Sequence, residues 1–378
     1  MAKYRLGDIA PVCQGMVADS NQCWLLNLDV VESNTGKILE YVYVDHSQIG
    51  ASTVSFDKMN VLYSKLRPYL NKVVLPDRAG YATSEMLPLR PNEQVITREY
   101  LTYFLRSPHF VKYINGKTSG AKMPRANIAD LKAVEIECPS IMEQNRITTQ
   151  FDLITRVIEK RQKELSTFDN LIKARFVELF GDPVSNPKGW EKKALSEEAE
   201  IKIGPFGSLL HKEDYITGGH ALVNPSHIVD GKIAPDDKLT ISDEKYDELS
   251  AYHLRTGDVV MGRRGEMGRC AVVEQPGLLC GTGSLLIRTN GDLSADYIQK
   301  IISFPSFKRT IEEMAVGQTM PNLNVPIVSA FQIIKPPKSV QNQYYSFVAQ
   351  VDKSKAVVQK ALDKAQLLFD SLMQKYFG

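Results

Sequence analysis

Apolar residues recur at steps of three and four positions along residues 141–181 and again along residues 338–378. This spacing is typical of a long helix with one apolar seam, as in a coiled coil. A helix with a single apolar seam is stable only when another surface covers it, so we expect the two helices to pair. In this pairing Ile154 and Leu362 should face the opposite helix. The predicted seam consists of Ile147, Phe151, Ile154, Ile158, Leu165, Phe168 and Ile172 in the first stretch and Val348, Val351, Val358, Leu362 and Phe369 in the second.

One cation interrupts each seam, Arg161 in the first and Lys355 in the second. A buried polar group at a seam position can fix the register of the two helices. A long cationic side chain can instead lie along apolar surface and extend its charge into water. The sequence is compatible with both roles. Gly181, followed by Pro183, indicates where the first helix ends.

The two helical stretches belong to a longer duplication with a constant offset of 197 positions. Such an offset, kept over some 60 positions without a gap, indicates two copies of one unit. The matching positions are Met123-Pro124 with Met320-Pro321, Asn127 with Asn324, Pro139 with Pro336, Leu165 with Leu362, and Phe180-Gly181 with Phe377-Gly378.

Residues 1–140 and 182–337 precede the two helical stretches and have the same order of predicted elements. Each contains short β-rich runs separated by turn residues, then one helix, predicted at residues 98–113 and 296–315. Arg288 falls 198 residues after Arg90, close to the general offset. We therefore predict an α+β protein with two β-rich domains (residues 1–140 and 182–337) and two long helices (141–181 and 338–378).

Composition adds limits rather than a function. A length of 378 residues fits two or three domains. A net charge of +2 neither requires nor excludes a nucleic-acid partner, so a DNA surface must come from local clustering of cations. No apolar run approaches the length of a membrane span, and no export signal is visible at the N-terminus. The five cysteines never form C-x-x-C, which favours a reducing cytoplasm; they are Cys13, Cys23, Cys138, Cys270 and Cys280.

The order of elements, together with the helix ends ARFVELFG and SLMQKYFG and the repeated G-x-x-M-P loop, resembles the specificity subunit of type I restriction-modification enzymes. The resemblance covers the whole chain. It implies that each globular unit is a target-recognition domain reading one half of a split DNA site. It also implies that the two helices form an antiparallel coiled-coil spacer and dock the modification and restriction subunits. Recognition loops vary within this family, so no base contact carries over to this chain.

The segment GRRGEMGR at residues 262–269 is the strongest local candidate for a DNA surface. Its glycines allow close approach of backbone to phosphate, and Arg263, Arg264 and Arg269 can pair with phosphates or guanine edges. A solvated hairpin turn is the alternative. The counterpart in the first domain offers Lys65, Arg67 and Lys72. The G-x-x-M-P loops are plain polar loops or further contacts, and supply Lys117, Lys122 and Arg125 in one copy and Gln318, Thr319, Asn322 and Asn324 in the other.

Catalytic signatures are sparse. The chain has no G-x-x-x-x-G-K-[ST] loop for ATP, no H-E-x-x-H zinc motif, and no metal-ligand spacing among its histidines. The Pro-Pro pair in IKPPK, at residues 334–338, lacks the Asn or Asp before it and the aromatic after it that a DNA methyltransferase motif needs. We expect no catalytic residue, metal or cofactor on this chain.

The resulting hypothesis is a sequence-specific DNA-binding subunit that directs catalytic partners. The implied partners are double-stranded DNA, methyltransferase (modification) subunits and restriction/translocase subunits, with no membrane. S-adenosylmethionine, ATP and Mg would belong to the partner subunits. One alternative is a DNA methyltransferase fused to its own reader. Another is a coiled-coil adaptor without a nucleic-acid role, which the modest net charge allows.

Overall fold

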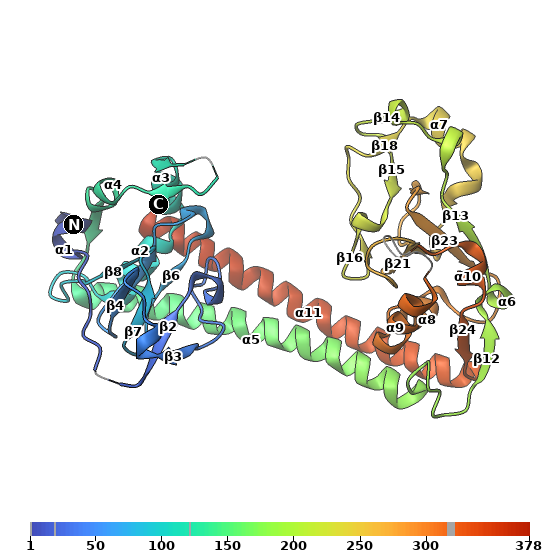
Figure 1. The fold of residues 1–378 in the computed structure, drawn as a ribbon, viewed down its shortest axis with the longest axis horizontal. Helices are drawn as coiled ribbons and strands as arrows, with labels where there is room; N and C mark the ends of the chain where they lie inside the picture. The colour runs from blue at the N-terminus through green and yellow to red at the C-terminus, as the bar shows by residue number, and fades with distance from the viewer. Residues whose placement is uncertain (1, 19, 121, 316–321) are drawn as a thin grey trace. The chain divides into compact units, whose positions relative to one another are not determined.

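The computed structural model describes residues 2–18, 20–120, 122–315 and 322–378 (Figure 1). The chain forms two compact units. Unit 1 contains residues 1–167 and 355–378, and unit 2 contains residues 168–354. Each unit therefore joins one predicted recognition domain to part of both long helices. None of the helices that the structure describes is long and apolar enough to cross a membrane.

The long helices are α5 (Ile141–Phe180) and α11 (Lys338–Phe377), with 40 residues each. In unit 1 the first part of α5 packs against the last part of α11, with the rings of Phe151 and Phe369 5.3 Å apart (Figure 1). In unit 2 the end of α5 packs against the start of α11, with the rings of Phe176 and Tyr344 5.6 Å apart. The two helices are thus antiparallel partners, and the predicted α+β fold with a duplicated unit and paired helices is confirmed.

The seam residues cover one another to different degrees along the pair. Ile147, Phe151 and Val351 are buried, and the other nine predicted seam residues are half-buried. Arg161 donates from Nη1 to the Glu164 carboxylate of its own helix at 2.6 Å, so its charge is neutralised beside the seam and remains partly exposed.

The head of unit 1, meaning its part outside the long helices, consists of small sheets with helices packed beside them. The strands pair antiparallel except for residues 22–26 and 80–83, which pair parallel. The core of this head includes the apolar face of α2 (Arg98–Arg106) and the strands β5 (Val61–Ser64) and β8 (Met86–Leu89). The strand pairs and sheets are β1 (Ala2–Arg5) with β11 (Glu135–Cys138), β3 (Tyr43–Asp45)-β2 (Gln22–Leu26)-β7 (Gly80–Thr83)-β4 (Thr53–Phe56), β6 (Val73–Val74)-β5 (Val61–Ser64)-β8 (Met86–Leu89), and β9 (Thr118–Ser119) with β10 (Arg125–Ala126). The helices are α1 (Leu6–Ile9), α2 (Arg98–Arg106), α3 (Pro108–Asn115) and α4 (Ile128–Lys132).

The head of unit 2 repeats this order and adds a larger sheet. Its sheets are β12 (Glu191–Ala194) with β24 (Gln332–Lys335), β13 (Ala199–Ile203)-β23 (Ser284–Thr289)-β20 (Val259–Gly262)-β21 (Cys270–Val272), and β14 (Tyr215–Ile216)-β18 (Thr240–Ile241)-β15 (His220–Val223)-β22 (Leu278–Cys280)-β19 (His253–Leu254), with β16 (Ile228–Val229) and β17 (Lys232–Ile233) as a separate hairpin. The helices are α6 (Leu195–Glu198), α7 (Asp243–Glu248), α8 (Ala295–Ile302), α9 (Pro305–Met314) and α10 (Val325–Ser329).

The single helix predicted in each head is in fact two helices. In unit 1 the break falls at Ser107, whose hydroxyl accepts a hydrogen bond from the backbone N–H of Phe110 and so caps α3. Pro108 is the first residue of α3, where its missing N–H costs nothing. In unit 2 the same break precedes Pro305. The proline in each predicted helix was therefore a start signal for a second helix.

Each head is also anchored to its own edge strand by a buried tyrosine. The Tyr100 hydroxyl on α2 donates to the Glu137 carbonyl on β11 at 3.2 Å. The Tyr297 hydroxyl on α8 donates to the Ile334 carbonyl on β24 at 3.0 Å. Tyr297 lies 197 residues after Tyr100, and Ile334 lies 197 residues after Glu137. The duplication therefore extends from the sequence to individual hydrogen bonds.

Candidate nucleic-acid interface

In unit 1 the structure brings together the two segments that the sequence singled out. The chain leaves β5 at Lys65, whose carbonyl accepts a hydrogen bond from Ala126 N at 2.8 Å. Arg67 N donates to the Pro124 carbonyl at 2.7 Å, and Leu66 forms an isolated antiparallel bridge with Arg125. We call the loop after β5, which begins at Lys65, the basic loop, and the loop around Met123-Pro124 the M-P loop. The two loops form one surface at the same end of the β5–β8 pair.

Unit 2 repeats this junction with different side chains. The Arg263 carbonyl, just after β20, accepts a hydrogen bond from Leu323 N at 3.0 Å. The Arg263 side chain donates from Nε to the Asn322 amide oxygen at 3.2 Å. Leu323 is the counterpart of Ala126 at the 197-residue offset. The backbone junction is thus shared by the two heads, while the polar groups it presents differ.

Carboxylates pair with three of the six predicted cations of unit 1. Glu85 accepts from Arg125 Nε at 3.0 Å and Nη2 at 2.8 Å, and it lies 3.9 Å from Lys65 Nζ. Lys117 pairs with Asp130 at 3.3 Å, and its ammonium lies 4.6 Å from the centre of the Tyr113 ring. These cations are therefore oriented by neighbours and are not freely available to a phosphate.

The remaining predicted cations of unit 1 have three different environments. Lys72 Nζ donates to the Leu28 carbonyl at 2.6 Å, which fixes that side chain within the head. Lys122 is exposed. Arg67 adopts a left-handed backbone conformation with φ +48°, which a non-glycine residue rarely takes. Strain of this kind persists where surrounding structure imposes it, often at binding sites. Among the described residues, neither Arg67 nor Lys122 has a carboxylate partner, so both stay candidates for the predicted DNA contact.

In unit 2, Glu266 has the neutralising role. Arg269 donates to its carboxylate from Nη2 at 2.6 Å and Nε at 3.1 Å, and Lys308 adds an ion pair at 3.0 Å. Hydrogen bonds from Arg269 and then Lys308 lower the pKa of Glu266 below its usual value, so the group is ionised at neutral pH. Arg264 is exposed and has no hydrogen-bond or ion-pair partner among the described residues. Arg264 is the cation of this loop most accessible to a phosphate.

The last polar candidates lie in the second M-P loop. Gln318 and Thr319 lie outside the residues that the structure describes. Asn324 caps α10, because its side-chain oxygen accepts a hydrogen bond from Ile327 N at 3.0 Å. Asn127 caps α4 in the same way through Ala129 N at 2.9 Å. The Asn324 oxygen is therefore used by the fold.

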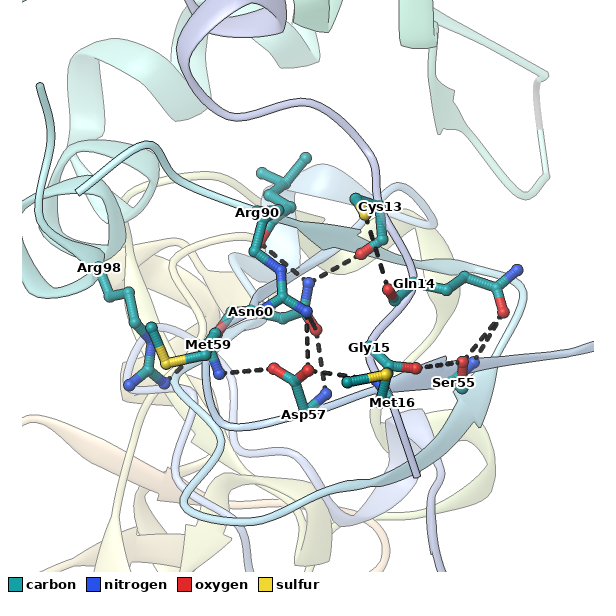
Figure 2. A network of polar contacts seen from close by, with 11 residues as sticks. Cys13, Gln14, Gly15, Met16, Ser55, Asp57, Met59, Asn60, Arg90 and Arg98 are labelled. Atoms are coloured by element: carbon teal, nitrogen blue, oxygen red, sulfur yellow. Dashed lines mark hydrogen bonds and ion pairs between the residues drawn. The ribbon is translucent and has the colours of Figure 1, made fainter. Parts of the chain in front are cut away.

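A partly buried polar network at the opposite end of the β5–β8 pair was not foreseen from the sequence (Figure 2). Arg90 donates from Nη2 to the Asp57 carboxylate at 2.8 Å and to the Asn60 side-chain oxygen at 3.4 Å. Asn60 in turn donates to the Cys13 carbonyl at 2.9 Å. Asp57 also accepts from Met59 N at 2.7 Å and Met16 N at 3.2 Å. The network ties residues 13–16 to the start of β5.

Unit 2 has a simpler version of this network. Arg288 donates to the buried Asp258 carboxylate from Nη2 at 2.7 Å and from Nε at 2.8 Å. Arg90 directly follows β8, which pairs with β5, and Arg288 lies near the end of β23, which pairs with β20. In each head the carboxylate precedes the strand that pairs with the arginine's strand. The arginines are 198 residues apart, whereas Asp57 and Asp258 are 201 apart. In the sequence, only the spacing of the two arginines indicated this shared ion pair. The spacing of the two aspartates differs from it, so the carboxylate partners could not be recognised.

The buried thiols are poor nucleophiles. Burial raises the pKa of Cys138 and of Cys270 to about 11 and that of Cys280 to about 12, so these thiols stay protonated at neutral pH. No group of three or more His, Cys, Asp or Glu in the described ranges is arranged to hold a metal ion.

These features define a class of protein with two related heads, each of which packs against parts of both long helices. A family model for the type I restriction modification DNA specificity domain matches the chain at residues 1–167 and again at residues 187–366. The chain therefore belongs to the type I restriction-modification DNA specificity family, and it contains two copies of the domain.

Known proteins of this kind are similar over nearly the full chain. The type I restriction enzyme MjaIX specificity subunit of Methanocaldococcus jannaschii is 22% identical over 370 residues, covering 89% of this chain and 82% of that protein. A structure described for complex assembly and conformational transition of the type I R-M system has 17% identity and a TM-score of 0.64, covering 100% of this chain and 97% of that one. The type I restriction-modification S subunit from M. genitalium has 15% identity and a TM-score of 0.58, covering 100% and 96%. These two structures share the fold.

Proposed function

We propose that this chain is the DNA-recognition subunit of a type I restriction-modification complex and that it reads a bipartite DNA site. The observation that carries this proposal is the repeated junction of the basic loop with the M-P loop. One backbone hydrogen bond of this junction, from Ala126 N and from Leu323 N, recurs in both heads, but it ends on Lys65 in one head and on Arg263 in the other. A shared frame with different side chains is what two readers of different half-sites require.

Recognition in each head would combine phosphate contacts with base contacts. Arg264 and Lys122 are exposed cations suited to phosphates, which fix position without reading sequence. Arg263 is half-buried, and its hydrogen bonds to the loop at Asn322 hold its side chain at a fixed angle. An arginine oriented in this way is suited to the two acceptors of a guanine edge.

The long helices offer a surface for the catalytic partners. In unit 1, Leu153 and Val157 on α5 are 56% and 45% exposed, and Val357, Leu367 and Leu368 on α11 are 71%, 68% and 51% exposed. Apolar side chains gathered along paired helices are typical of a protein interface. We assign these residues to docking of methyltransferase (modification) subunits, with restriction/translocase subunits joining the same cytoplasmic complex.

Catalysis would then reside in the partners. S-adenosylmethionine, ATP and Mg would bind the modification and restriction subunits, and this chain alone would neither transfer methyl groups nor hydrolyse ATP. Two rivals make different predictions. A methyltransferase fused to its own reader would methylate DNA without partners, and a helical adaptor would bind no DNA even within the complex.

A salt series with the assembled complex separates these possibilities. A DNA reader should lose affinity steeply as salt rises, because its cations release counterions from the phosphates. Methylation assays with the purified chain and with the complex provide the second measurement. Methyl transfer by the chain alone would support the fused enzyme. Absence of DNA binding by a complex that contains all its subunits would support the adaptor.

A further inference from the structure

We propose that Phe206, in the loop after β13 of unit 2, places its ring against a base of the DNA half-site that this head reads. Phe206 is 61% exposed, whereas Pro205 before it is buried. Single exposed apolar side chains are common on protein surfaces, so the surroundings of this ring decide its role. This role rests on the DNA-reading function proposed above, to which it adds one base-contacting residue.

The loop after β13 and the loop after β20 leave the same end of one sheet. β13 and β20 both pair antiparallel with β23, on its two sides, so they run in the same direction and end together. Adjacent strands lie about 5 Å apart, so the two loops begin about 10 Å from each other. A major groove is about 12 Å wide. The two loops can therefore meet the same few base pairs.

Hydrogen bonds to neighbouring residues at the start of β23 hold both loops in place. Gly204 N donates to the Ser284 carbonyl at 3.1 Å, and Arg263 N donates to the Gly283 carbonyl at 3.0 Å. Gly204 also packs closely on backbone, because a Cβ added to it would lie 2.0 Å from the Gly281 carbonyl oxygen. The loop after β13 therefore begins at a fixed place beside the loop that carries Arg263.

The residues around Phe206 form a tight turn. A single 3-10 turn (Gly207–Leu209) follows at once, and Leu209 N donates to the Phe206 carbonyl at 3.4 Å. Gly207 has φ +63°, a left-handed conformation that glycine adopts without strain. Pro205 on one side and this turn on the other leave the backbone that carries the ring few alternatives. A ring presented in this way loses little conformational entropy when it makes a contact.

Two further segments of unit 2 join the loops at this end of the sheet. Gly283 N donates to the Asn224 side-chain oxygen at 3.3 Å, and Leu323 N donates to the Arg263 carbonyl at 3.0 Å. The five contiguous segments are residues 204–210, 224–227, 262–265, 281–284 and 322–324.

The charge of these five segments favours DNA over a protein partner. They contain Arg263 and Arg264 and neither aspartate nor glutamate. Glu266 lies just beyond them, and its carboxylate is already paired with Arg269 and Lys308. Cations without competing carboxylates attract phosphates, and an aromatic ring among such cations is suited to stacking on bases. In duplex DNA a ring reaches the face of a base by partly separating two stacked base pairs.

The chain takes a different course at the corresponding place in unit 1. β8 is the counterpart of β23, and beside it the chain forms an isolated bridge between Val12 and Leu89. Gly15 N then donates to the Ser55 carbonyl at 3.1 Å, so the chain continues toward β4. The loop that carries Phe206 is therefore a feature of unit 2, and we expect its ring to act on one half-site and not on the other.

The test uses the chain assembled with its modification subunits and a duplex that contains the site identified by a methylation map. Phe206→Ala should weaken binding about tenfold, because the ring no longer stacks on a base. The salt dependence of binding should stay unchanged, since the ring neutralises no phosphate. Phe206→Tyr keeps an aromatic ring and should bind within about twofold of the native complex.

Val184→Ala is the matched control for this loss. Val184 is an apolar residue of unit 2 that is 37% exposed, in the turn after α5 and outside the five segments. This variant should change DNA affinity less than about twofold, because no base contact is removed. Assembly with the modification subunits, measured without DNA, should be the same for the native chain, Phe206→Ala and Val184→Ala.

Photocrosslinking locates the ring on the DNA. Duplexes with 5-iodouracil or 5-iodocytosine in place of single pyrimidines crosslink under light to an aromatic ring stacked on the substituted base. Crosslinks to Phe206, identified by mass spectrometry, should come from one half-site only. Failure of the native complex to bind DNA would overturn the proposed function and this contact with it. If the native complex binds, then equal affinity of Phe206→Ala, absence of crosslinks to Phe206, or loss of assembly by Phe206→Ala without DNA would overturn the contact alone.

Discussion

The ring of Tyr100 on α2 packs against the ring of Phe377 at the end of α11, with the ring centres 5.1 Å apart. In unit 2 the ring of Tyr297 on α8 packs against Phe180 at the end of α5, also at 5.1 Å. Each head is therefore closed by the end of the helix that follows the other head in sequence. This exchange explains why each compact unit contains parts of both long helices.

Replacing Phe377 with alanine should destabilise unit 1. Phe377 is buried and also stacks on Phe151, so its loss leaves a cavity that typically costs about 3–5 kcal/mol. The chain has two tryptophans, Trp24 in unit 1 and Trp190 in unit 2, so single-tryptophan variants can follow each unit separately. The unfolding transition reported by Trp24 should move to lower denaturant, while that reported by Trp190 should stay in place. Leu367→Ala, at an exposed position, is the control. Equal shifts of both transitions would contradict independent closure of the heads.

Two neighbouring positions on α5 should separate folding from assembly. Ile154 is a half-buried seam residue, so Ile154→Asp places a carboxylate between the helices at a cost of several kcal/mol. It should disrupt the helix pair and with it assembly. Leu153→Asp lies on the exposed surface and should leave unfolding unchanged while weakening assembly. Size-exclusion chromatography with modification subunits, alongside thermal unfolding, measures both. Normal complexes with the Ile154 variant would show that the seam is misassigned.

Unit 1 should lose stability in acid through Asp57. Burial raises the pKa of this carboxyl, but hydrogen bonds from Arg90 and from the backbone N–H groups of Met59 and Met16 outweigh burial and lower it. A group whose pKa is lower in the folded state stabilises that state above its unfolded pKa of about 4. This stabilisation disappears as pH falls through the folded value. In the single-tryptophan variant that keeps Trp24, the stability of unit 1 should therefore fall below about pH 4 more steeply with Asp57 present than with Asp57→Asn. Identical slopes would show that Asp57 does not govern acid stability.

The arginines of the loop after β20 should differ in their contribution to DNA affinity. Arg264→Ala should weaken binding to all sequences and lower the salt slope by about one, because an exposed cation can pair with a phosphate. Arg269→Ala should have a smaller effect, since Glu266 already holds that guanidinium. Arg263→Ala should cost roughly 1–3 kcal/mol at a single base position if it reads guanine. Titrations with matched and mismatched duplexes at several salt concentrations measure all three. No change for any of the variants would place this loop away from DNA.

The sequence predicted the helices and the duplication because both depend on local period and spacing. The steps from Ile147 to Phe151 and the repeat of Pro139 at Pro336 are visible without coordinates. Residue pairs that strand pairing brings together cannot be recognised from the local period or spacing of the sequence. Glu85 reaches Arg125 from 40 residues away, and nothing in either segment indicates the pair. The sequence therefore showed which cations lie near one another along the chain, whereas the carboxylates that pair with some of them became apparent only in the structure.

Exchange of one head should change one half of the recognised DNA site and leave the other half. Each head joins the helices through matching residues, Pro139 before α5 and Pro336 before α11, and the helix pair is built from segments that an exchange of residues 182–337 leaves intact. Each head contributes its own basic loop and M-P loop, so the two half-sites should be read independently. If both heads read one face of the duplex, the half-sites lie about one helical turn apart, near 10 base pairs between centres. Replacing residues 182–337 with the corresponding segment of another family member should then produce a hybrid site with little change in spacing. Genome-wide methylation maps before and after the exchange measure this directly. An active hybrid that changes both halves, or a native site without an unread gap, would refute the two-headed reading.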